Sequence, residues 1–415
     1  MGLDNLYSKK QQEVLRYAMN NDYFMLINHG AKRSGKTMLD NDIFLYELKR
    51  VKAMADRLGI LCPQYILAGA DLSSIKRNVL NEITNKYGIE FQFDKSNRFR
   101  LFGVIVCCFG HTKMSDLARI RGMTAWGAYI NEATVANHYV FDEIKSRCSA
   151  PGARIIMDTN PDRPSHWLKT EYVDKADNKT IAEFHWCLTD NTFLDARYVD
   201  SIKAATPGGM FYQRDILGEW VAASGVVYPD FDPNVHYISK DKLPRITHYF
   251  CGVDFGWEHT GAIVLCGEDA DANLYLIKEW SAKHRSIDAW INIVKNEIET
   301  TTGRVALYCD SARPDLISEM AGAGLDARLA HKDVLAGISE IATRFKTRKL
   351  FVVKDNVDLF KQEIDAYIWK EDEDAPIKEN DDVLDALRYA IYSDKIERIE
   401  CASLVHDPAF LDVMI

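Results

Sequence analysis

The chain has 415 residues, of which 47% are hydrophobic and 27% are charged, which suffices for two globular domains and excludes a disordered chain. No apolar run reaches the ~18 residues of a membrane-spanning helix and no signal-peptide pattern is present, so we expect a cytosolic protein without a membrane contact. The formal net charge of −10 excludes a basic DNA-coating protein, but not an enzyme that grips DNA on one face.

In the first half of the chain, apolar runs of strand length alternate with helical patterns. This order predicts a largely parallel sheet with helices on both faces. The expected elements are helix 5–21, strand 24–28, a helix to about residue 58, strand 65–68, helix 72–86, strands within 100–109, strand 128–131 and strand 154–157.

A glycine-rich segment joins the first strand to the long helix and fits the P-loop pattern at every position. Its backbone N–H groups face phosphate oxygens, the lysine reaches the β- and γ-phosphates, and the hydroxyl ligates magnesium. The sequence therefore predicts a site for ATP with Mg²⁺. The expected nucleotide-binding residues in this loop are Gly30, Arg33, Ser34, Gly35, Lys36 and Thr37.

Glu132 follows the apolar strand 128–131, where a P-loop ATPase places the carboxylate that orients the attacking water. We expect it to be the catalytic residue. Asn131 stands where an aspartate usually supports the metal, and its amide can hold a magnesium-bound water without adding charge. A solvated glutamate at a strand end is the alternative interpretation.

Three further polar residues are candidates for the nucleotide site. Arg119 and Arg121 precede the 128–131 strand, and either is a candidate arginine finger in its own or a neighbouring subunit. Gln11 is a candidate for reading adenine with its amide. Ordinary surface charge and an exposed helix position are the alternatives for the arginines and the glutamine.

These segments together resemble the large terminase subunits of tailed bacteriophages. The resemblance lies in the early Gln11, the loop ending in Lys36-Thr37, the Asn-Glu-Ala strand end and the run Asp158-Thr-Asn-Pro161. In that family a Thr-Asn-Pro-type segment couples hydrolysis to DNA movement, which implies this role for Thr159 and Asn160. From the residues alone, Asn-Pro is also a common turn starter.

The second half is expected to form another α/β domain. Proline and glycine place the boundary near 221–245, so we expect a first domain at 1–220, a linker at 221–245, a second domain at 246–395 and a tail at 396–415. The expected elements are strands 249–253, 262–266 and 274–279, helix 287–300, strand 305–309, helix 334–345, strand 350–353, helix 357–369 and helix 382–393.

Acidic residues stand at the ends of two of these strands and at the start of the last helix. Asp254 and Asp310 end the strands, and Asp382 and Asp385 share one face of the helix. Convergent carboxylates repel and take up protons unless a divalent cation neutralises them. Two Mg²⁺ or Mn²⁺ ions held this way can cut a phosphodiester. A helix N-cap for Asp382 and a plain turn for Asp254 are the alternatives.

The second half also resembles the terminase family, whose C-terminal nuclease has an RNase H-like fold. The matching segments are Gly252–Gly256, Leu307–Ser311 and Glu379–Tyr389. The resemblance implies metal ligation and catalysis by Asp254, Asp310 and Asp385. Because some relatives carry histidine at the position of Asp382, we rank it below these three.

The resemblance implies a motor that hydrolyses ATP to move double-stranded DNA into a procapsid and a nuclease that cuts concatemeric DNA. It also implies the portal protein, a small terminase subunit and a homo-oligomeric ring as partners. The expected location is the host cytoplasm, transiently on the procapsid, with the protein absent from the finished virion.

Three other classes of protein are weighed against this interpretation. A P-loop DNA helicase or repair ATPase with a non-cleaving second domain is the main alternative. A transposase- or resolvase-like enzyme has no need of the P-loop, and an assembly scaffold needs neither site. The basic runs 283–285 and 344–349 are candidate DNA contacts, although exposed helix ends carry such charge too. Lys332 is a weaker candidate for a place beside the metal site.

Nine cysteines are present, and none forms a Cys-x-x-Cys pair. Cys107 and Cys108 lie inside an apolar run. We therefore expect reduced, buried thiols and neither disulfides nor a zinc site.

Overall fold

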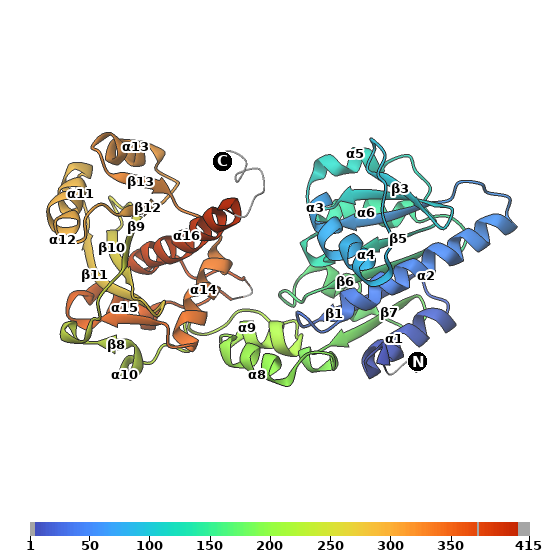
Figure 1. The fold of residues 1–415 in the computed structure, drawn as a ribbon, viewed down its shortest axis with the longest axis horizontal. Helices are drawn as coiled ribbons and strands as arrows, with labels where there is room; N and C mark the ends of the chain where they lie inside the picture. Colours follow the sequence, from blue (N-terminus) through green and yellow to red (C-terminus); the bar gives the residue numbers. More distant parts are fainter. Residues whose placement is uncertain (1–4, 372, 406–415) are drawn as a thin grey trace. The chain divides into compact units, whose positions relative to one another are not determined.

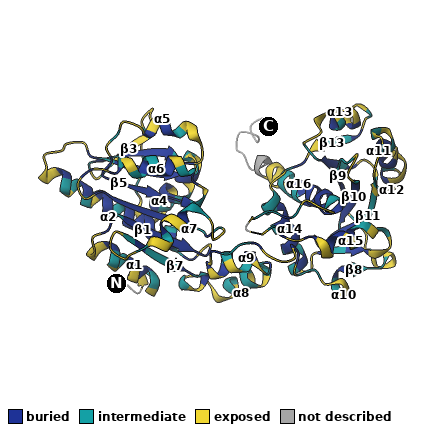
Figure 2. Ribbon diagram, turned by 180° about the vertical axis from the view of Figure 1, so that it is seen from behind, coloured by how far each residue is buried: buried dark blue, intermediate teal, exposed yellow. Residues whose placement is uncertain are grey.

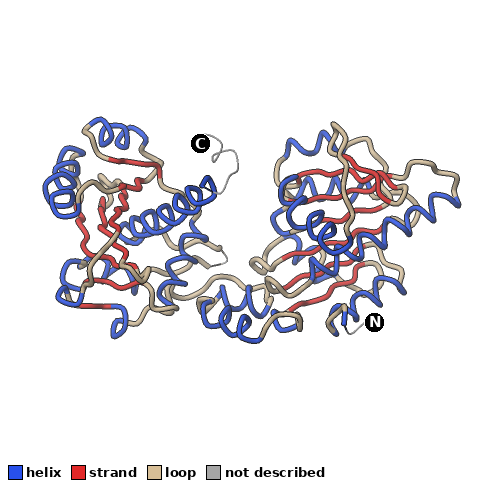
Figure 3. The backbone as a smooth tube through the Cα atoms, in the orientation of Figure 1, coloured by secondary structure: helices blue, strands red, loops and turns tan. Residues whose placement is uncertain are grey.

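A computed structural model describes residues 5–371 and 373–405. The chain divides into two compact units, one formed by Met1–Lys203 with Met210–Ala222 and the other by Ala204–Gly209 with Ala223–Ile415 (Figure 1). Each unit contains one seven-stranded sheet flanked by helices (Figure 3). The predicted α/β fold class is confirmed.

The first sheet has the strand order β3-β4-β2-β5-β6-β1-β7, and every pairing is parallel except β3 with β4. The middle of this order positions the candidate site, because β6 lies between β1 and β5. The strands are β1 Met25–Gly30, β2 Gln64–Gly69, β3 Arg98–Leu101, β4 Val104–Gly110, β5 Gly127–Ile130, β6 Arg154–Thr159 and β7 Ile181–Trp186.

Helices cover both faces of this sheet, and alternate strand residues enter two separate cores. Leu26 and Ile156 belong to one buried cluster, whereas Ile27 and Met157 belong to the other. Figure 2 shows the strands as the most buried part of the unit. The helices are α1 Lys9–Asn20, α2 Lys36–Arg57, α3 Leu72–Ile75, α4 Asn81–Tyr87, α5 Leu117–Ile120, α6 His138–Arg147, α7 Trp167–Glu171, α8 Ala196–Ala205 and α9 Met210–Tyr212.

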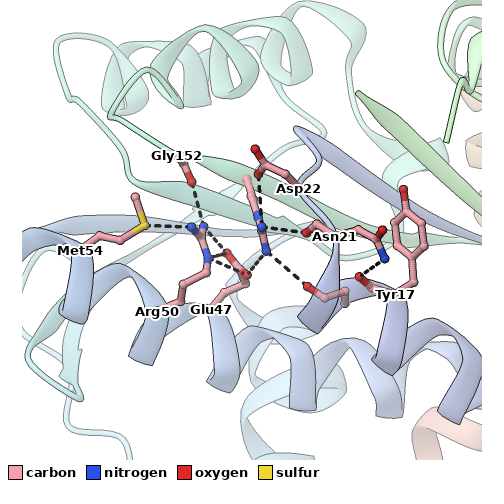
Figure 4. A network of polar contacts seen from close by, with 9 residues as sticks. Tyr17, Asn21, Asp22, Glu47, Arg50, Met54 and Gly152 are labelled. Atoms are coloured by element: carbon pink, nitrogen blue, oxygen red, sulfur yellow. Dashed lines mark hydrogen bonds and ion pairs between the residues drawn. The ribbon is translucent and has the colours of Figure 1, made fainter. Parts of the chain in front are cut away.

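A buried charge network joins α1, α2 and β6 at the sheet edge where β6 begins (Figure 4). Glu47, which is fully buried, pairs with Arg50 at 2.6 Å and with Arg154 at 3.4 Å. Arg154 also donates to the backbone oxygens of Ala18 and Asn21. These bonds fix the end of α1 against α2, the helix that follows the P-loop.

The second sheet has the order β13-β12-β9-β10-β11-β14-β8. β9 is parallel to β12 and antiparallel to β10, and β10 is antiparallel to β11. The ends of β9, β11 and β12 and the start of β10 therefore share one edge. The strands are β8 Tyr237–Ile238, β9 His248–Asp254, β10 Gly261–Glu268, β11 Leu274–Ala282, β12 Ala306–Cys309, β13 Asp326–Leu329 and β14 Leu350–Val353.

The long helix α16 packs across this sheet, closest to β9 and β10. Its approach requires Gly252, because a Cβ there would lie 1.8 Å from the Ala386 oxygen. The helix continues to Val405, so its predicted end at Ser393 is wrong. The helices of this unit are α10 Pro233–His236, α11 Ile287–Ile293, α12 Glu299–Thr302, α13 Pro314–Gly322, α14 Val334–Lys346, α15 Asp358–Ala366 and α16 Asp382–Val405.

The residues predicted as a linker, 221–245, lie almost entirely in the second unit, where β8 pairs with β14. The predicted tail 396–415 begins inside α16, and residues 406–415 lie outside the described part. All nine cysteines are free, but Cys62 and Cys401 are exposed and Cys187 is partly exposed, so the expectation of buried thiols is wrong for these three. Within the described residues, no helix is long and apolar enough to span a bilayer.

Candidate functional site

The turn from β1 into α2 has the backbone that a P-loop needs. Gly30 has φ +145°, and a Cβ there would lie 2.1 Å from the Trp186 oxygen. Gly35, at the N-cap of α2, has φ +91°. Both positions require glycine, because L side chains rarely adopt these values. Tight curvature at the start of a 22-residue helix directs free N–H groups and the positive helix end toward one point.

Lys36 is buried beneath this turn, with 5% of its surface exposed. Its ammonium donates to the oxygens of Gly30 at 3.1 Å and Ala31 at 2.9 Å, and to Asn160 Oδ1 at 2.8 Å. Burial lowers the pKa of Lys36 to about 8, although nearby carboxylates including Asp158 act in the opposite direction. The loop therefore holds the lysine with neutral acceptors alone.

Asp158, at the end of β6, organises the neighbouring end of β5. Its buried carboxylate accepts from the Asn131 amide at 2.9 Å, the Glu132 backbone N–H at 2.8 Å and the Tyr129 hydroxyl at 3.0 Å. Glu132 takes a left-handed backbone with φ +58°, which is uncommon for a non-glycine residue. Burial, followed by the charge of Asp158, raises the pKa of Glu132. Asp158 on the adjacent strand thus places a buried carboxylate directly behind Asn131.

Thr159 and Asn160 connect the two strand ends. The Thr159 hydroxyl accepts from the Thr134 backbone N–H at 2.9 Å and lies 2.6 Å from the Thr134 hydroxyl. Asn160 contacts Lys36 through its side chain, and its backbone oxygen accepts from the Thr134 hydroxyl at 3.1 Å. The segment therefore contacts both the P-loop and the residues after Glu132.

These groups line one cavity of about 590 Å³, which we call the P-loop cavity. It includes Arg77, which the sequence did not single out. Arg77 lies in a π-helical turn, Lys76–Leu80, a distortion that is frequent at functional sites. Its charge opposes the rise in the pKa of Glu132. The lining residues are Lys32, Arg33, Lys36, Thr37, Met38, Arg77, Asn78, Glu82, Asn131, Glu132 and Asn160.

The other residues predicted for this site lie around the loop. Gln11 is buried and donates to the Gly35 oxygen at 3.0 Å, while its amide oxygen accepts from the Ser8 backbone at 2.9 Å. The Arg33 guanidinium lies 5.4 Å from the centre of the Tyr198 ring. Ser34 is buried, and its hydroxyl has no hydrogen-bond partner within the described part of the chain.

The two candidate arginine fingers do not line the P-loop cavity. Arg119 is in α5, and Arg121 follows that helix with an exposed side chain 3.9 Å from Glu143. Neither observation tests a contact with a neighbouring subunit, so each arginine remains a predicted arginine finger only toward a neighbouring subunit.

In the second unit, the predicted carboxylates meet at the shared edge of the sheet. Asp254 ends β9, and Asp310 follows β12 with its N–H bonded to the Val253 oxygen at 2.9 Å. Asp382 and Asp385 come from the first turn of α16. Together with Asp381 they line a cavity of about 680 Å³, which we call the acidic cavity.

Burial and neighbouring charges raise the pKa of three of these carboxylates. Burial, followed by the charges of Asp385 and Asp310, raises the pKa of Asp254 to about 8. Burial and Asp385 raise the pKa of Asp381 to about 6, and burial raises that of Asp382. One oxygen of Asp381 is buried without a hydrogen-bond partner among the described residues. This donor set fits a hard divalent cation.

Three cations lie beside the same carboxylates. Lys332 forms an ion pair with Asp310. Asp385 pairs with the buried Arg388 at 2.9 Å and with Lys378 at 3.8 Å. Within the described ranges, no three acidic, histidine or cysteine side chains have the arrangement of a formed metal site. The carboxylates share a cavity, and two of them, Asp310 and Asp385, pair with basic side chains.

Glu363 on α15 caps the helix that carries the acids. Its carboxylate accepts from the backbone N–H groups of Val383 at 2.9 Å and Leu384 at 3.0 Å. It is fully buried, and burial raises its pKa to about 8. Sequence reasoning missed this residue and assigned the capping alternative to Asp382. Glu363 satisfies two of the free N–H groups at this helix start.

The two basic runs differ in their surroundings. In 344–349, Arg344 pairs with Glu340 at 2.8 Å, Lys346 with Asp230 at 2.9 Å, and Lys349 donates to the Asp271 oxygen at 3.2 Å. These bonds favour a structural role. By contrast, Lys283 of the 283–285 run lines the acidic cavity.

Comparisons with known proteins agree with this arrangement. The family described as "Terminase large subunit, T4likevirus-type, N-terminal" matches residues 29–234. A solved structure of the large terminase from a thermophilic bacteriophage superposes with a TM-score of 0.77 at 24% identity, covering 94% of this chain and 99% of that one. The complex of the same phage protein with ATP-gamma-S gives 0.74 at 26% identity, covering 92% and 98%, and its ADP complex gives 0.75 at 25% with the same coverage. A comparison with curated protein sequences found no match.

Proposed function

We infer that the chain is a large terminase subunit of a tailed bacteriophage, a DNA-packaging ATPase with a nuclease domain, because it matches that family's model and solved structures. Its two units divide these activities between them. The first unit hydrolyses ATP to move double-stranded DNA into a procapsid. The second cuts concatemeric DNA with divalent metal ions. The observation that carries the proposal is the P-loop cavity, where Lys36, Glu132 and Asn160 converge, while the acidic cavity is built entirely from the other unit.

The residues of the P-loop cavity take separate roles toward ATP. The phosphates accept from the N–H groups at the start of α2, and the Lys36 ammonium exchanges its carbonyl partners for phosphate oxygens. Glu132, held by its backbone bond to Asp158, orients the attacking water. Arg77, which lines the same cavity, offsets negative charge on the terminal phosphate. Thr37 would hold a magnesium ion, which would supply charge neutralisation to the phosphates. The relative from the thermophilic phage was solved with ADP and with ATP-gamma-S.

Asn160 and Thr159 relay hydrolysis to the DNA-contacting surface. The side chain of Asn160 and the P-loop both accept hydrogen bonds from Lys36. Loss of the γ-phosphate therefore changes which acceptors the Lys36 ammonium contacts. Thr159 passes the shift to the 133–135 turn through Thr134. Coupling requires that this segment take a second hydrogen-bonded arrangement after hydrolysis.

In the second unit, Asp254, Asp310 and Asp385 would hold two Mg²⁺ or Mn²⁺ ions, with Asp382 at the margin. Bound there, such ions would supply an activated water and charge stabilisation for the leaving oxygen of a phosphodiester. Arg388 orients Asp385 from the buried side. Lys332 and Lys378 lie beside Asp310 and Asp385 as counter-charges.

Family membership also suggests the setting in which the protein works. We propose that it assembles as a ring on the portal protein, receives DNA from a small terminase subunit, acts in the host cytoplasm and leaves before the virion is complete. Ring assembly would give Arg119 or Arg121 access to a neighbouring P-loop cavity.

The test is an assay of purified full-length protein with plasmid DNA. We expect ATP hydrolysis that requires Mg²⁺, and DNA cleavage that requires Mg²⁺ or Mn²⁺ but persists without ATP, since the two sites lie in separate units. ATP hydrolysis without any metal-dependent cleavage would contradict the nuclease and favour the helicase or repair ATPase alternative.

A further inference from the structure

An exposed aromatic residue stands beside the acidic cavity and has no part in the proposed chemistry. Trp257, in the loop between β9 and β10, exposes 53% of its surface. We propose that Trp257 and Lys283 form a DNA-binding lip, in which the indole contacts the sugar and base edges of a duplex and the ammonium contacts a phosphate next to the cleaved one. This inference rests on the proposed nuclease.

The sheet register places the lip at the carboxylates. Asp254 pairs with Ala262, and Gly261 pairs with Ala282. The loop 255–260 therefore leaves the edge at Asp254, and the segment 283–286 leaves the same edge at the end of β11. The first loop begins at a proposed metal ligand, and the second segment begins two strands away, about 10 Å along the same edge.

The two loops are bound to each other. The His284 backbone N–H donates to the Trp257 oxygen at 3.1 Å, and the two rings meet edge to face with centroids 5.6 Å apart. His284 has φ +54°, a left-handed conformation that is uncommon for residues other than glycine. These contacts fix the base of the lip and leave the indole accessible. A single exposed apolar side chain is ordinary, so its significance depends on what lies beside it.

Beside the indole lies the positive charge that a polyanion requires. Lys283 lines both the acidic cavity and the adjoining cavity of about 670 Å³, which Arg285 also lines. Lys283 and His259 line the acidic cavity together with Asp382. The Lys278 ammonium is not available in the same way for a phosphate contact, because it pairs with the Glu297 carboxylate at 3.0 Å.

Charge complementarity selects nucleic acid as the occupant. A phosphate backbone must come within reach of the carboxylates of the acidic cavity, and cations at the entrance offset that repulsion. An aromatic ring next to such cations adds a contact with the sugars of the duplex, which are the same at every base pair and carry no sequence information. Together they position the duplex without reading it.

The experiment measures binding of a fluorescently labelled duplex of about 20 base pairs to the full-length protein, with Ca²⁺ in place of Mg²⁺, at several salt concentrations. We expect Trp257→Ala to weaken binding about tenfold without changing the slope of log affinity against log salt, and Trp257→Phe to retain most of the affinity. Lys283→Ala should reduce that slope by about one. Phe193→Ala, at an aromatic residue of the first unit that is 55% exposed, is the matched control and should bind normally.

Cleavage kinetics provide the second readout. With Mn²⁺, Trp257→Ala should raise the KM for DNA and leave kcat unchanged, because the ring contacts DNA and not the reacting phosphate. If wild-type protein cuts DNA and Trp257→Ala matches it in affinity and KM, the lip is wrong and the nuclease stands. The lip is also overturned if Trp257→Ala weakens DNA binding and reduces the slope of log affinity against log salt as Lys283→Ala does. That result would indicate a displaced loop. If wild-type protein cuts no DNA, the nuclease proposal fails and the lip with it.

Discussion

At the start of α2, the Lys36 ammonium is surrounded by acceptors, whereas at the end of β9 the Asp254 carboxylate is surrounded by other carboxylates. Lys36 bonds to two loop oxygens and to Asn160, and Asp158 accepts three hydrogen bonds from the end of β5. Asp254 instead faces four like charges, and its pKa rises to about 8.

This difference separates two ways of building a site. Satisfied hydrogen bonds hold the P-loop cavity in shape before a ligand arrives, so its chemistry should depend on single side chains. The acidic cavity carries an excess of negative charge that protons and lysines offset, so its final shape should depend on metal ions. Substitutions should therefore affect the two units independently, and a rise in pH should change ligand binding at the two sites in opposite directions.

The largest effect is expected for Glu132→Gln. This change removes the carboxylate that orients water, so ATP hydrolysis should fall about 10²–10⁴-fold, while ATP binding and Mn²⁺-dependent DNA cleavage persist. Glu82→Gln, at the other acid of the P-loop cavity, is the control and should hydrolyse ATP normally. Steady-state turnover and plasmid cleavage measure both activities. Wild-type turnover by Glu132→Gln would mean that another group orients the water.

The matching change in the second unit is Asp310→Asn or Asp385→Asn. Each removes a ligand charge at nearly constant shape, so DNA cleavage should fall at least about a hundredfold with ATP hydrolysis unchanged. The control is Asp315→Asn, because Asp315 is exposed and pairs with Arg313 at 2.8 Å outside the acidic cavity. Persistent cleavage by folded Asp310→Asn and Asp385→Asn proteins would contradict the proposal of a two-metal nuclease.

Proton linkage should have opposite directions at the two sites. Burial lowers the pKa of Lys36 to about 8, and bound phosphate raises it, so ATP binding takes up a proton above pH 8 and its affinity falls by up to about tenfold per pH unit. Asp254 is protonated below about 8, so Mn²⁺ binding releases a proton and strengthens as pH rises toward 8. Calorimetry in buffers of different ionisation enthalpy measures both. Lys36→Arg should abolish the first effect, and proton release on ATP binding at pH 9 would contradict it.

Local patterns were enough to predict the P-loop and the strand-end acids. A strand, a glycine turn and a helix are adjacent in sequence at Lys36, and Asp254 and Asp310 directly end apolar strands. The role of Asp158 was not predictable, because it depends on β6 inserting between β1 and β5. Arg77 lines the P-loop cavity because it lies in a π-helical turn, and the sequence carries no pattern that predicts such a turn.

Some elements were missed for the same reason. β7 has a mixed polar pattern, and only its parallel pairing with β1 makes it a strand. Helix α6 was not predicted, although Val140, Phe141 and Ile144 bury one face of it. Tertiary packing, which no short window reports, decides both cases.

The smallest effect is expected at Glu363, which supports the acidic cavity from behind. Its folded pKa of about 8 exceeds the unfolded value of about 4.3, so the folded protein keeps a proton that the unfolded chain loses. The free energy of unfolding therefore falls as pH rises through this window. Glu363→Gln has no proton to lose and still accepts from the start of α16. Relative to wild type, we expect it to gain stability from pH 5 to 8, by on the order of 1 kcal/mol per pH unit at most, with little change in cleavage. Denaturant unfolding of the full chain measures the difference, and the exposed Glu319→Gln serves as control. If Glu363→Gln instead loses stability relative to wild type as pH rises from 5 to 8, the ionised carboxylate, not the protonated acid, caps α16.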